Sequence, residues 1–174
     1  MKYKFRIPIE KVGQYAEQYD FSAETKLEKY HQIGPRQGCL TVDQLYEICR
    51  WKSKRKAARA KSNPDDFVKE ITTFSFSAKC ERSRIESLML LDGVRMPTAS
   101  VILHFCVDQT YPILDVRVLW SLAIEKPSIY SFSFWEEYTE ICRTMAKELS
   151  MSVRELDMAL WQYSKKHQPT KIAP

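Results

Sequence analysis

The most specific pattern in the chain lies at residues 85–124, which read IESLMLLDGVRMPTASVILHFCVDQTYPILDVRVLWSLAI. Apolar residues at helical spacing end at Leu91, and a tight turn follows at Asp92-Gly-Val-Arg95. A second apolar helix begins near Pro97. The pattern therefore predicts a helix, a hairpin and a helix over about residues 84–107.

The sequence of this hairpin suits a binding role. Val94 stands where one apolar side chain can plug the space between the two helices. The hairpin then presents backbone N–H groups and the positive end of the second helix outward, an arrangement that suits a phosphate. An ordinary turn between two helices explains the spacing alone equally well.

An acid ends the apolar segment that comes next. Tyr111-Pro-Ile-Leu-Asp115 approaches it, and residues 116–122 then have the pattern of a helix. Asp115 stands at the N-cap of that helix, and capping is the usual role of an isolated Asp in this position. The combination of a hairpin, a helix, an apolar approach and an acid is much less common.

Capping signals predict helices in most of the remaining chain. A side-chain acceptor followed three residues later by Glu or Gln predicts helices that begin after Thr41, Ser83, Ser133 and Ser152. Asn63 before Pro64 predicts another, and Ser22 is expected to cap a helix that stops at Gly34-Pro35. Alternation at Tyr3, Phe5, Ile7 and Ile9 indicates a short edge strand or an extended arm.

These elements predict one all-α domain of about seven to nine helices, residues 1–174. The tail, residues 167–174, is expected to fray. With 44% hydrophobic residues, 4 Gly and 8 Pro among 174 residues, the composition argues against disorder and excludes a collagen-like chain. No apolar run approaches the ~18 residues of a membrane span, and the N-terminus lacks signal-peptide features, so we expect an intracellular protein.

The five cysteines do not indicate a disulfide framework or a zinc ribbon, because the number is odd and no pair has Cys-x-x-Cys spacing. Cys49, Cys106 and Cys142 lie among apolar residues at helical spacing, which predicts core positions. The formal net charge of +5 is only mildly basic. The distribution of charge therefore matters more than its total.

Residues 85–124 resemble the helix-hairpin-helix (HhH-GPD) DNA glycosylase superfamily, which includes endonuclease III and the adenine-mismatch glycosylase. The family hairpin typically reads L-P-G-V-G-x-x-T-A, and this chain has Leu91-Asp-Gly-Val-Arg-Met-Pro-Thr-Ala99. The family's catalytic acid lies in an apolar segment before a helix, which Ile113-Leu-Asp115-Val-Arg-Val matches. The match covers about 40 of the 174 residues, and it implies that Asp115 is the catalytic residue.

The chain departs from the family pattern at positions that limit which activity and cofactors the resemblance implies. Position 97, which precedes Asp115 by the family spacing of 18 residues, holds Pro where bifunctional members have the Schiff-base lysine. The resemblance therefore implies a monofunctional enzyme. Arg95 replaces the second hairpin glycine, which would cost about 1–2 kcal/mol if that site needs a positive φ. After residue 124 only Cys142 remains, so no iron–sulfur cluster and no other cofactor is expected.

A basic segment, residues 50–61, holds seven cationic residues and no acid, either as a solvated helix face or as a phosphate-binding surface. The expected DNA contacts are Lys52, Lys54, Arg55, Lys56, Gly93, Val94, Arg95, Thr98 and Arg117. Candidates for the base pocket or a probe are Trp51, Ser53, Tyr111, Trp120 and Trp161. Core packing is the more common role of such aromatic residues. Three scattered histidines do not suggest a metal site.

The resemblance implies a DNA glycosylase that hydrolyses the N-glycosidic bond of a flipped base in double-stranded DNA and leaves an abasic site. The excised base stays open among oxidised, alkylated, deaminated and phage-modified bases. We expect a monomer in the cytoplasm or nucleoid, or in the nucleus of a eukaryote, without a membrane partner. A non-catalytic helix-hairpin-helix DNA-binding protein and an unrelated helical protein are the alternatives.

Overall fold

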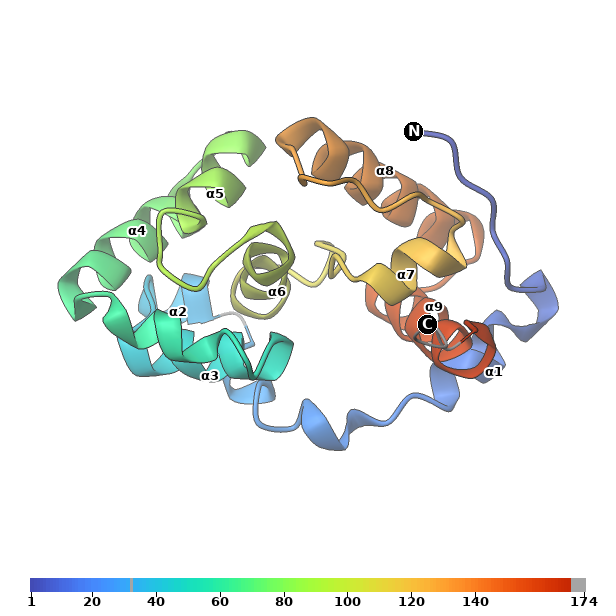
Figure 1. The fold of residues 1–174 in the computed structure, drawn as a ribbon, viewed down its shortest axis with the longest axis horizontal. Helices are drawn as coiled ribbons and strands as arrows, with labels where there is room; N and C mark the ends of the chain where they lie inside the picture. The colour runs from blue at the N-terminus through green and yellow to red at the C-terminus, as the bar shows by residue number, and fades with distance from the viewer. Residues whose placement is uncertain (32, 170–174) are drawn as a thin grey trace, which may run out of the picture. The chain divides into compact units, whose positions relative to one another are not determined.

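The computed structural model describes residues 1–31 and 33–169, and this part of the chain is helical without a β-strand (Figure 1). The predicted all-α class is confirmed. The chain forms two compact units that the sequence did not distinguish. Unit 1 comprises Met1–Asp20 and Leu114–Pro174, and unit 2 comprises Phe21–Ile113.

Unit 2 contains the predicted hairpin. Its helices, in chain order, are η2 (Phe21–Ala23), η3 (Glu28–Tyr30), α2 (Ile33–Gln37), α3 (Val42–Lys52), η4 (Ala57–Ser62), α4 (Asp65–Ser77), α5 (Glu81–Leu88) and α6 (Met96–Cys106). Ten of the eleven residues of α6 are buried, so α6 is the central helix of this unit. It packs against α3 and α5, and α5 packs in turn against α4.

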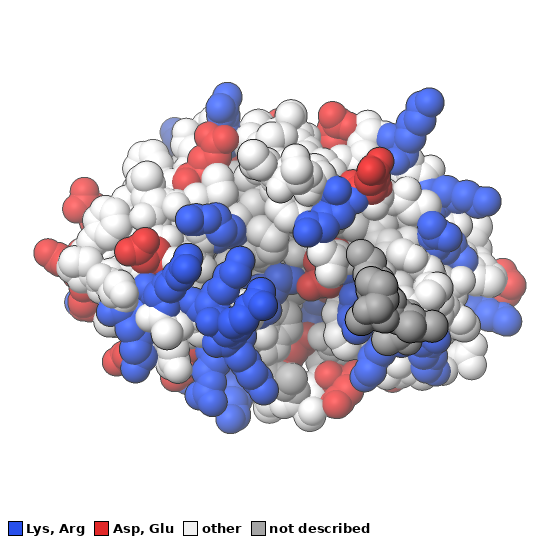
Figure 2. Space-filling model, in the orientation of Figure 1, with Lys and Arg blue, Asp and Glu red and all other residues white. Residues whose placement is uncertain are grey.

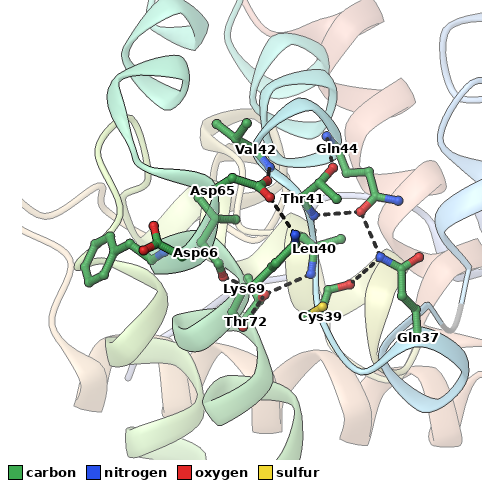
Figure 3. A network of polar contacts seen from close by, with 12 residues as sticks. Gln37, Cys39, Leu40, Thr41, Val42, Gln44, Asp65, Asp66, Lys69 and Thr72 are labelled. Carbon is green, nitrogen blue, oxygen red and sulfur yellow. Dashed lines mark hydrogen bonds and ion pairs between the residues drawn. The ribbon is translucent and has the colours of Figure 1, made fainter.

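Polar contacts at the start of α3 join this helix to α4 (Figure 3). The Thr41 hydroxyl and the Gln44 side chain form the predicted capping box. The N–H of Leu40 donates to Thr72 Oγ1 at 2.9 Å. The N–H of Val42 donates to Asp65 Oδ1 at 2.8 Å. Asp65 of α4 thus satisfies the first N–H of α3, and Thr72 of α4 binds the residue before its N-cap.

Unit 1 is built around the last helix. Its helices are η1 (Ile9–Lys11), α1 (Val12–Glu17), α7 (Val116–Ser121), α8 (Phe132–Glu148) and α9 (Val153–His167). α9 packs against α1, α7 and α8, and Trp135 and Tyr138 of α8 are fully buried. The Ser121 hydroxyl donates to the carbonyl of Leu160 at 2.6 Å, which fixes the end of α7 on α9.

The N-terminal segment is an extended arm, which decides between the two interpretations of its alternating sequence. The N–H of Lys4 donates to the Leu122 carbonyl at 2.8 Å, and that of Arg6 to the Ser121 carbonyl at 3.0 Å. Arg6 Nε also donates to the Trp120 carbonyl at 2.8 Å. The arm thus satisfies carbonyl groups at the C-terminal end of α7, which a helix leaves unpaired.

Outside residues 85–124, the predicted caps at Thr41 and Ser152 are confirmed, and those at Asn63, Ser83 and Ser133 are wrong. The capping boxes at Thr41 and Ser152 form as predicted. α4 has Pro64 at its N-cap without a side-chain bond, α5 begins after Cys80 instead of Ser83, and α8 begins after Ser131 instead of Ser133. In α5 and α8, an extended residue upstream takes the cap position, so the predicted cap lies inside the helix.

The predicted helix from Ser22 to Gly34-Pro35 is also wrong. That stretch holds the short helices η2 and η3, and Gly34 and Pro35 lie inside α2. Cys49, Cys106 and Cys142 are buried, which confirms their core assignment. Of the tail predicted to fray, residues 170–174 lie outside the described residues. No helix in the described ranges is long and apolar enough to cross a membrane.

Candidate functional site

The hairpin turn, residues 89–95, joins α5 to α6 in unit 2 (Figure 1). Gly93 has a φ of +84°, in the left-handed region that favours glycine. Arg95 has a φ of −135°, so the strain expected from an arginine at this position is absent. The Val94 side chain is fully buried, as its role of a plug requires. It therefore offers a ligand only its backbone.

The hairpin turn has N–H groups available for an acceptor. The N–H of Val94 donates to the Leu91 carbonyl at 3.1 Å. Within residues 1–31 and 33–169, no acceptor takes the N–H groups of Gly93, Arg95 or Met96. Pro97 has none to give. The first turn of α6 therefore combines a positive helix end with unpaired donors, which is the physical requirement for holding a phosphate.

The hairpin turn is bonded to the residue that follows η4. Asn63 Nδ2 donates to the carbonyls of Asp92 and Ala60 at 3.0 and 2.9 Å. Asn63 Oδ1 accepts the N–H of Asp92 at 2.8 Å. A Cβ added to Gly93 would lie 2.9 Å from the Ala60 nitrogen, so the two backbones touch. The structure thus brings the hairpin turn into contact with η4 of the basic segment, although the two are separate in the sequence.

The basic segment, residues 50–61, runs from the end of α3 through a turn into η4. Figure 2 shows Lys and Arg side chains gathered over this part of unit 2. Lys54, Arg55 and Lys56 are exposed, and no carboxylate among the described residues forms an ion pair with them or with Arg59. No described carboxylate therefore neutralises their positive charge, as a surface for a polyanion requires.

Three candidates in unit 2 are held by packing. Trp51 is half-buried, with its ring edge-on to Phe105 at 5.7 Å between centroids. Thr98 is only 8% exposed. Tyr111 is 5% exposed, and its hydroxyl donates to Glu81 Oε1 at 2.9 Å. Tyr111 therefore serves the core rather than an open base pocket.

The two remaining candidates in this unit lie at the end of α3. Lys52 is the last residue of the helix and Ser53 is its C-cap, and both are half-buried. The N–H of Ser53 donates to the Cys49 carbonyl at 2.8 Å. This bond ends α3 at the start of the exposed cationic residues.

Asp115 lies in unit 1, at the N-cap of α7, and it is half-buried. Its Oδ1 accepts the N–H of Arg117 at 2.9 Å, so the predicted cap is confirmed. Burial raises the pKa of Tyr130, and the negative charge of Asp115 raises it further.

The aromatic candidates of unit 1 hold cations. Arg6 lies over the Trp120 ring at 4.8 Å from its centroid, and Trp120 stacks on Tyr163 at 6.0 Å. Arg117 and Lys165 lie over the Trp161 ring at 5.2 and 5.3 Å. These cation–π contacts hold the cations against the rings. Both indoles are thus already engaged in contacts within unit 1.

Sequence reasoning missed Asn63, Arg6 and Tyr130. Asn63 was interpreted as the cap of α4, because Asn before Pro is a common helix start, whereas its amide bonds to a turn 29 residues away. Arg6 bonds to Trp120 and Tyr130 lies within the influence of the Asp115 charge, and both partners are more than a dozen positions away, where the local pattern holds no signal. In the described ranges, no group of three or more His, Cys, Asp or Glu residues is arranged to hold a metal ion.

In comparisons with known proteins, no family model, curated protein or solved structure matches the chain.

Proposed function

We propose that the protein is a monofunctional DNA glycosylase that hydrolyses the bond between deoxyribose and a modified base and leaves an abasic site. The observation that supports this most is the backbone at the two positions of the resemblance. Gly93 takes the left-handed conformation that a hairpin glycine supplies, and Asp115 begins the next helix after an extended approach. We further propose that it acts as a monomer where the DNA is, in the nucleoid or the nucleus.

The binding step uses unit 2. The unneutralised cations of the basic segment attract the phosphates and release counterions, which supplies affinity for any sequence. The N–H groups of Gly93, Arg95 and Met96 offer directed bonds to a phosphate oxygen. The target base must leave the helical stack, which costs a few kcal/mol and is cheapest for a damaged or mispaired base.

The chemical step uses Asp115. As the glycosidic bond breaks, its electron pair leaves with the base, and positive charge develops on the sugar. A carboxylate close to the sugar stabilises this charge and orients a water molecule. The water oxygen bonds to C1′, one of its protons passes to the carboxylate and from there to the solvent, and the departing base takes up a proton from the solvent. Pro97 carries no amine, so no imine to the sugar forms at this position.

One observation favours a second candidate function, a non-catalytic DNA-binding protein. Asp115 already accepts the Arg117 N–H as a helix cap, a role that fully explains an Asp at this position. The hairpin turn and the basic segment would serve such a protein equally well.

A panel of duplexes separates the two candidates. Each duplex carries one oxidised, alkylated, deaminated or phage-type modified base, and strand cleavage is scored after hot alkali. Glycosylase activity gives alkali-dependent breaks at one class of base. Binding of the duplexes without any breaks identifies the non-catalytic protein, and absence of both overturns the proposal.

A further inference from the structure

Asn63 makes a contact that its sequence neighbours do not explain. It is 7% exposed and lies between η4 and α4, yet its amide bonds to both backbone groups of Asp92. The same Nδ2 donates to the carbonyl of Ala60. One side chain thus joins the backbone of η4 to that of the hairpin turn.

The two backbones have little room to move against each other. The nearest atoms to a Cβ at Gly93 would be the nitrogen of Ala60 at 2.9 Å and the carbonyl carbon of Arg59 at 3.4 Å. Arg59 and Lys61 flank Ala60 in sequence, and both are exposed. The cations of η4 are therefore one residue away from the backbone on which the hairpin turn rests.

We propose that Asn63 is a positioning residue that holds the hairpin turn and the basic segment together as one surface for neighbouring phosphates of a DNA strand. This inference rests on the proposed function. It adds that the hairpin and the cations act as a single site whose spacing is set by one buried amide.

An amide is the side chain that this role needs. Asn donates through its nitrogen and accepts through its oxygen, so it pairs with an N–H and a C=O at once. Aspartate has the same shape, but it would place a carboxylate oxygen against the carbonyls of Ala60 and Asp92. It would also add negative charge beside the phosphate surface. Replacement of Asn63 by alanine removes all three hydrogen bonds, so only packing would hold the hairpin turn in place.

The experiment compares Asn63→Ala with Thr72→Val in the full chain. Thr72 is also buried in unit 2, and its hydroxyl accepts the N–H of Leu40 and donates to the Val68 carbonyl (Figure 3). Thr72→Val therefore removes a buried polar link without touching the hairpin turn. The probe is an unmodified duplex, with its dissociation constant measured over a salt series, and a melting curve is recorded for each variant.

Asn63→Ala is expected to weaken duplex binding about fivefold to tenfold and to lower the salt slope by about one, because the changed spacing between η4 and the hairpin turn leaves one cation without its phosphate. Asn63→Asp is expected to weaken binding further at low salt. Thr72→Val should lower the melting temperature and leave the salt slope unchanged. Equal affinities and equal slopes for Asn63→Ala and the unmodified protein would overturn the proposal and leave Asn63 a merely structural residue.

The readout keeps this inference separate from the enzymatic claim. Duplex binding needs no base release, so the expected changes at Asn63 can appear in a protein that excises nothing. If the unmodified protein shows no salt-dependent binding to a duplex, both the inference and the DNA-binding part of the proposed function are overturned.

Discussion

The hairpin turn of unit 2 and the Asp115 region of unit 1 both lie in residues 85–124, but different contacts hold them in place. The hairpin turn is held by its own buried valine, by a left-handed glycine and by an amide 29 residues away. Asp115 is held by a local cap, and its helix is fixed by an arm from the far end of the sequence. The candidate binding features are thus concentrated in unit 2, and the candidate acid belongs to unit 1.

Glycine substitutions test how tightly the hairpin turn is held. Gly93 and Gly38 have nearly the same φ, +84° and +82°, but a Cβ at Gly38 would meet nothing within 4 Å. Gly93→Ala is expected to lower the free energy of unfolding by about 2–4 kcal/mol, from the backbone strain and the contact with Ala60. Gly38→Ala should lower it by only about 1–2 kcal/mol, from strain alone.

Denaturant titration followed by circular dichroism measures both values. Labelling of the buried thiols Cys49 and Cys106 places the loss in unit 2, with Cys142 reporting unit 1. If Gly93→Ala costs no more than Gly38→Ala, the hairpin turn is not packed against η4 as described.

Removal of cations tests whether binding belongs to unit 2. Replacing Lys54, Arg55 and Lys56 together by Ala should weaken duplex binding about tenfold to a hundredfold near 0.1 M salt and reduce the salt slope by about two to three. The fold should persist because all three side chains are exposed.

The matched control removes three cations of unit 2 that already pair with carboxylates. These are Lys29 with Glu47, Lys69 with Asp65 and Arg82 with Glu86. Their replacement by Ala changes the net charge equally but should leave the salt slope nearly unchanged. Equal slopes for the two triple variants would make net charge, rather than the basic segment, the source of affinity.

Sequence predicted the features that depend on neighbouring residues. The capping boxes at Thr41 and Ser152, the helix after Asp115 and the buried plug Val94 need only a few adjacent side chains, so their pattern was sufficient. The division into two units was not predicted, because unit 1 is assembled from both ends of the chain.

The predictions that were wrong also involve features that a local pattern does not determine. Ser83 and Ser133 match the capping pattern, but the preceding extended residue settles where α5 and α8 begin. The stretch from Ser22 to Gly34 offers two cap-like ends without a sustained apolar stripe, and short helices form there instead. The role of Asn63 depends on a turn far along the chain, which no local pattern records.

Arg6 in unit 1 has the linking role that Asn63 has in unit 2. Arg6→Ala removes the bond to the Trp120 carbonyl and the cation over its ring, and should lower the free energy of unfolding by about 1–2 kcal/mol. Lys4→Ala is the control, because Lys4 binds the end of α7 through its backbone N–H alone. Equal stabilities in a denaturant titration would mean that the arm does not support α7 through the Arg6 side chain.

The smallest expected effect is on the pH dependence of stability, and it comes from a comparison of the two capping boxes. Glu155 closes the box of α9 in unit 1, and its hydrogen bonds to Ser152 lower its pKa below the ordinary 4.5. Gln44 closes the box of α3 in unit 2 and does not titrate. A carboxyl group with a lowered folded pKa stabilises the fold above its unfolded pKa and loses this contribution as the pH falls through the folded value.

The melting temperature of the unmodified protein should therefore fall slightly relative to Glu155→Gln as the pH is lowered from about 5 to about 3. Gln44→Ala should lower the melting temperature by the same amount at both pH values. If the difference in melting temperature between the unmodified protein and Glu155→Gln does not change with pH, the ionisation of Glu155 does not contribute to stability.

The catalytic role of Asp115 is tested most directly by single-turnover base release from the duplex that the protein cleaves in the panel, with Asp115→Asn compared with Asp108→Asn. Both carboxylates accept the N–H two residues ahead, at 2.9 and 2.7 Å, and Asn preserves that bond. We expect Asp115→Asn to abolish release while the duplex affinity stays within about twofold, and Asp108→Asn to keep full activity. Release at the normal rate by a folded Asp115→Asn protein would contradict the account.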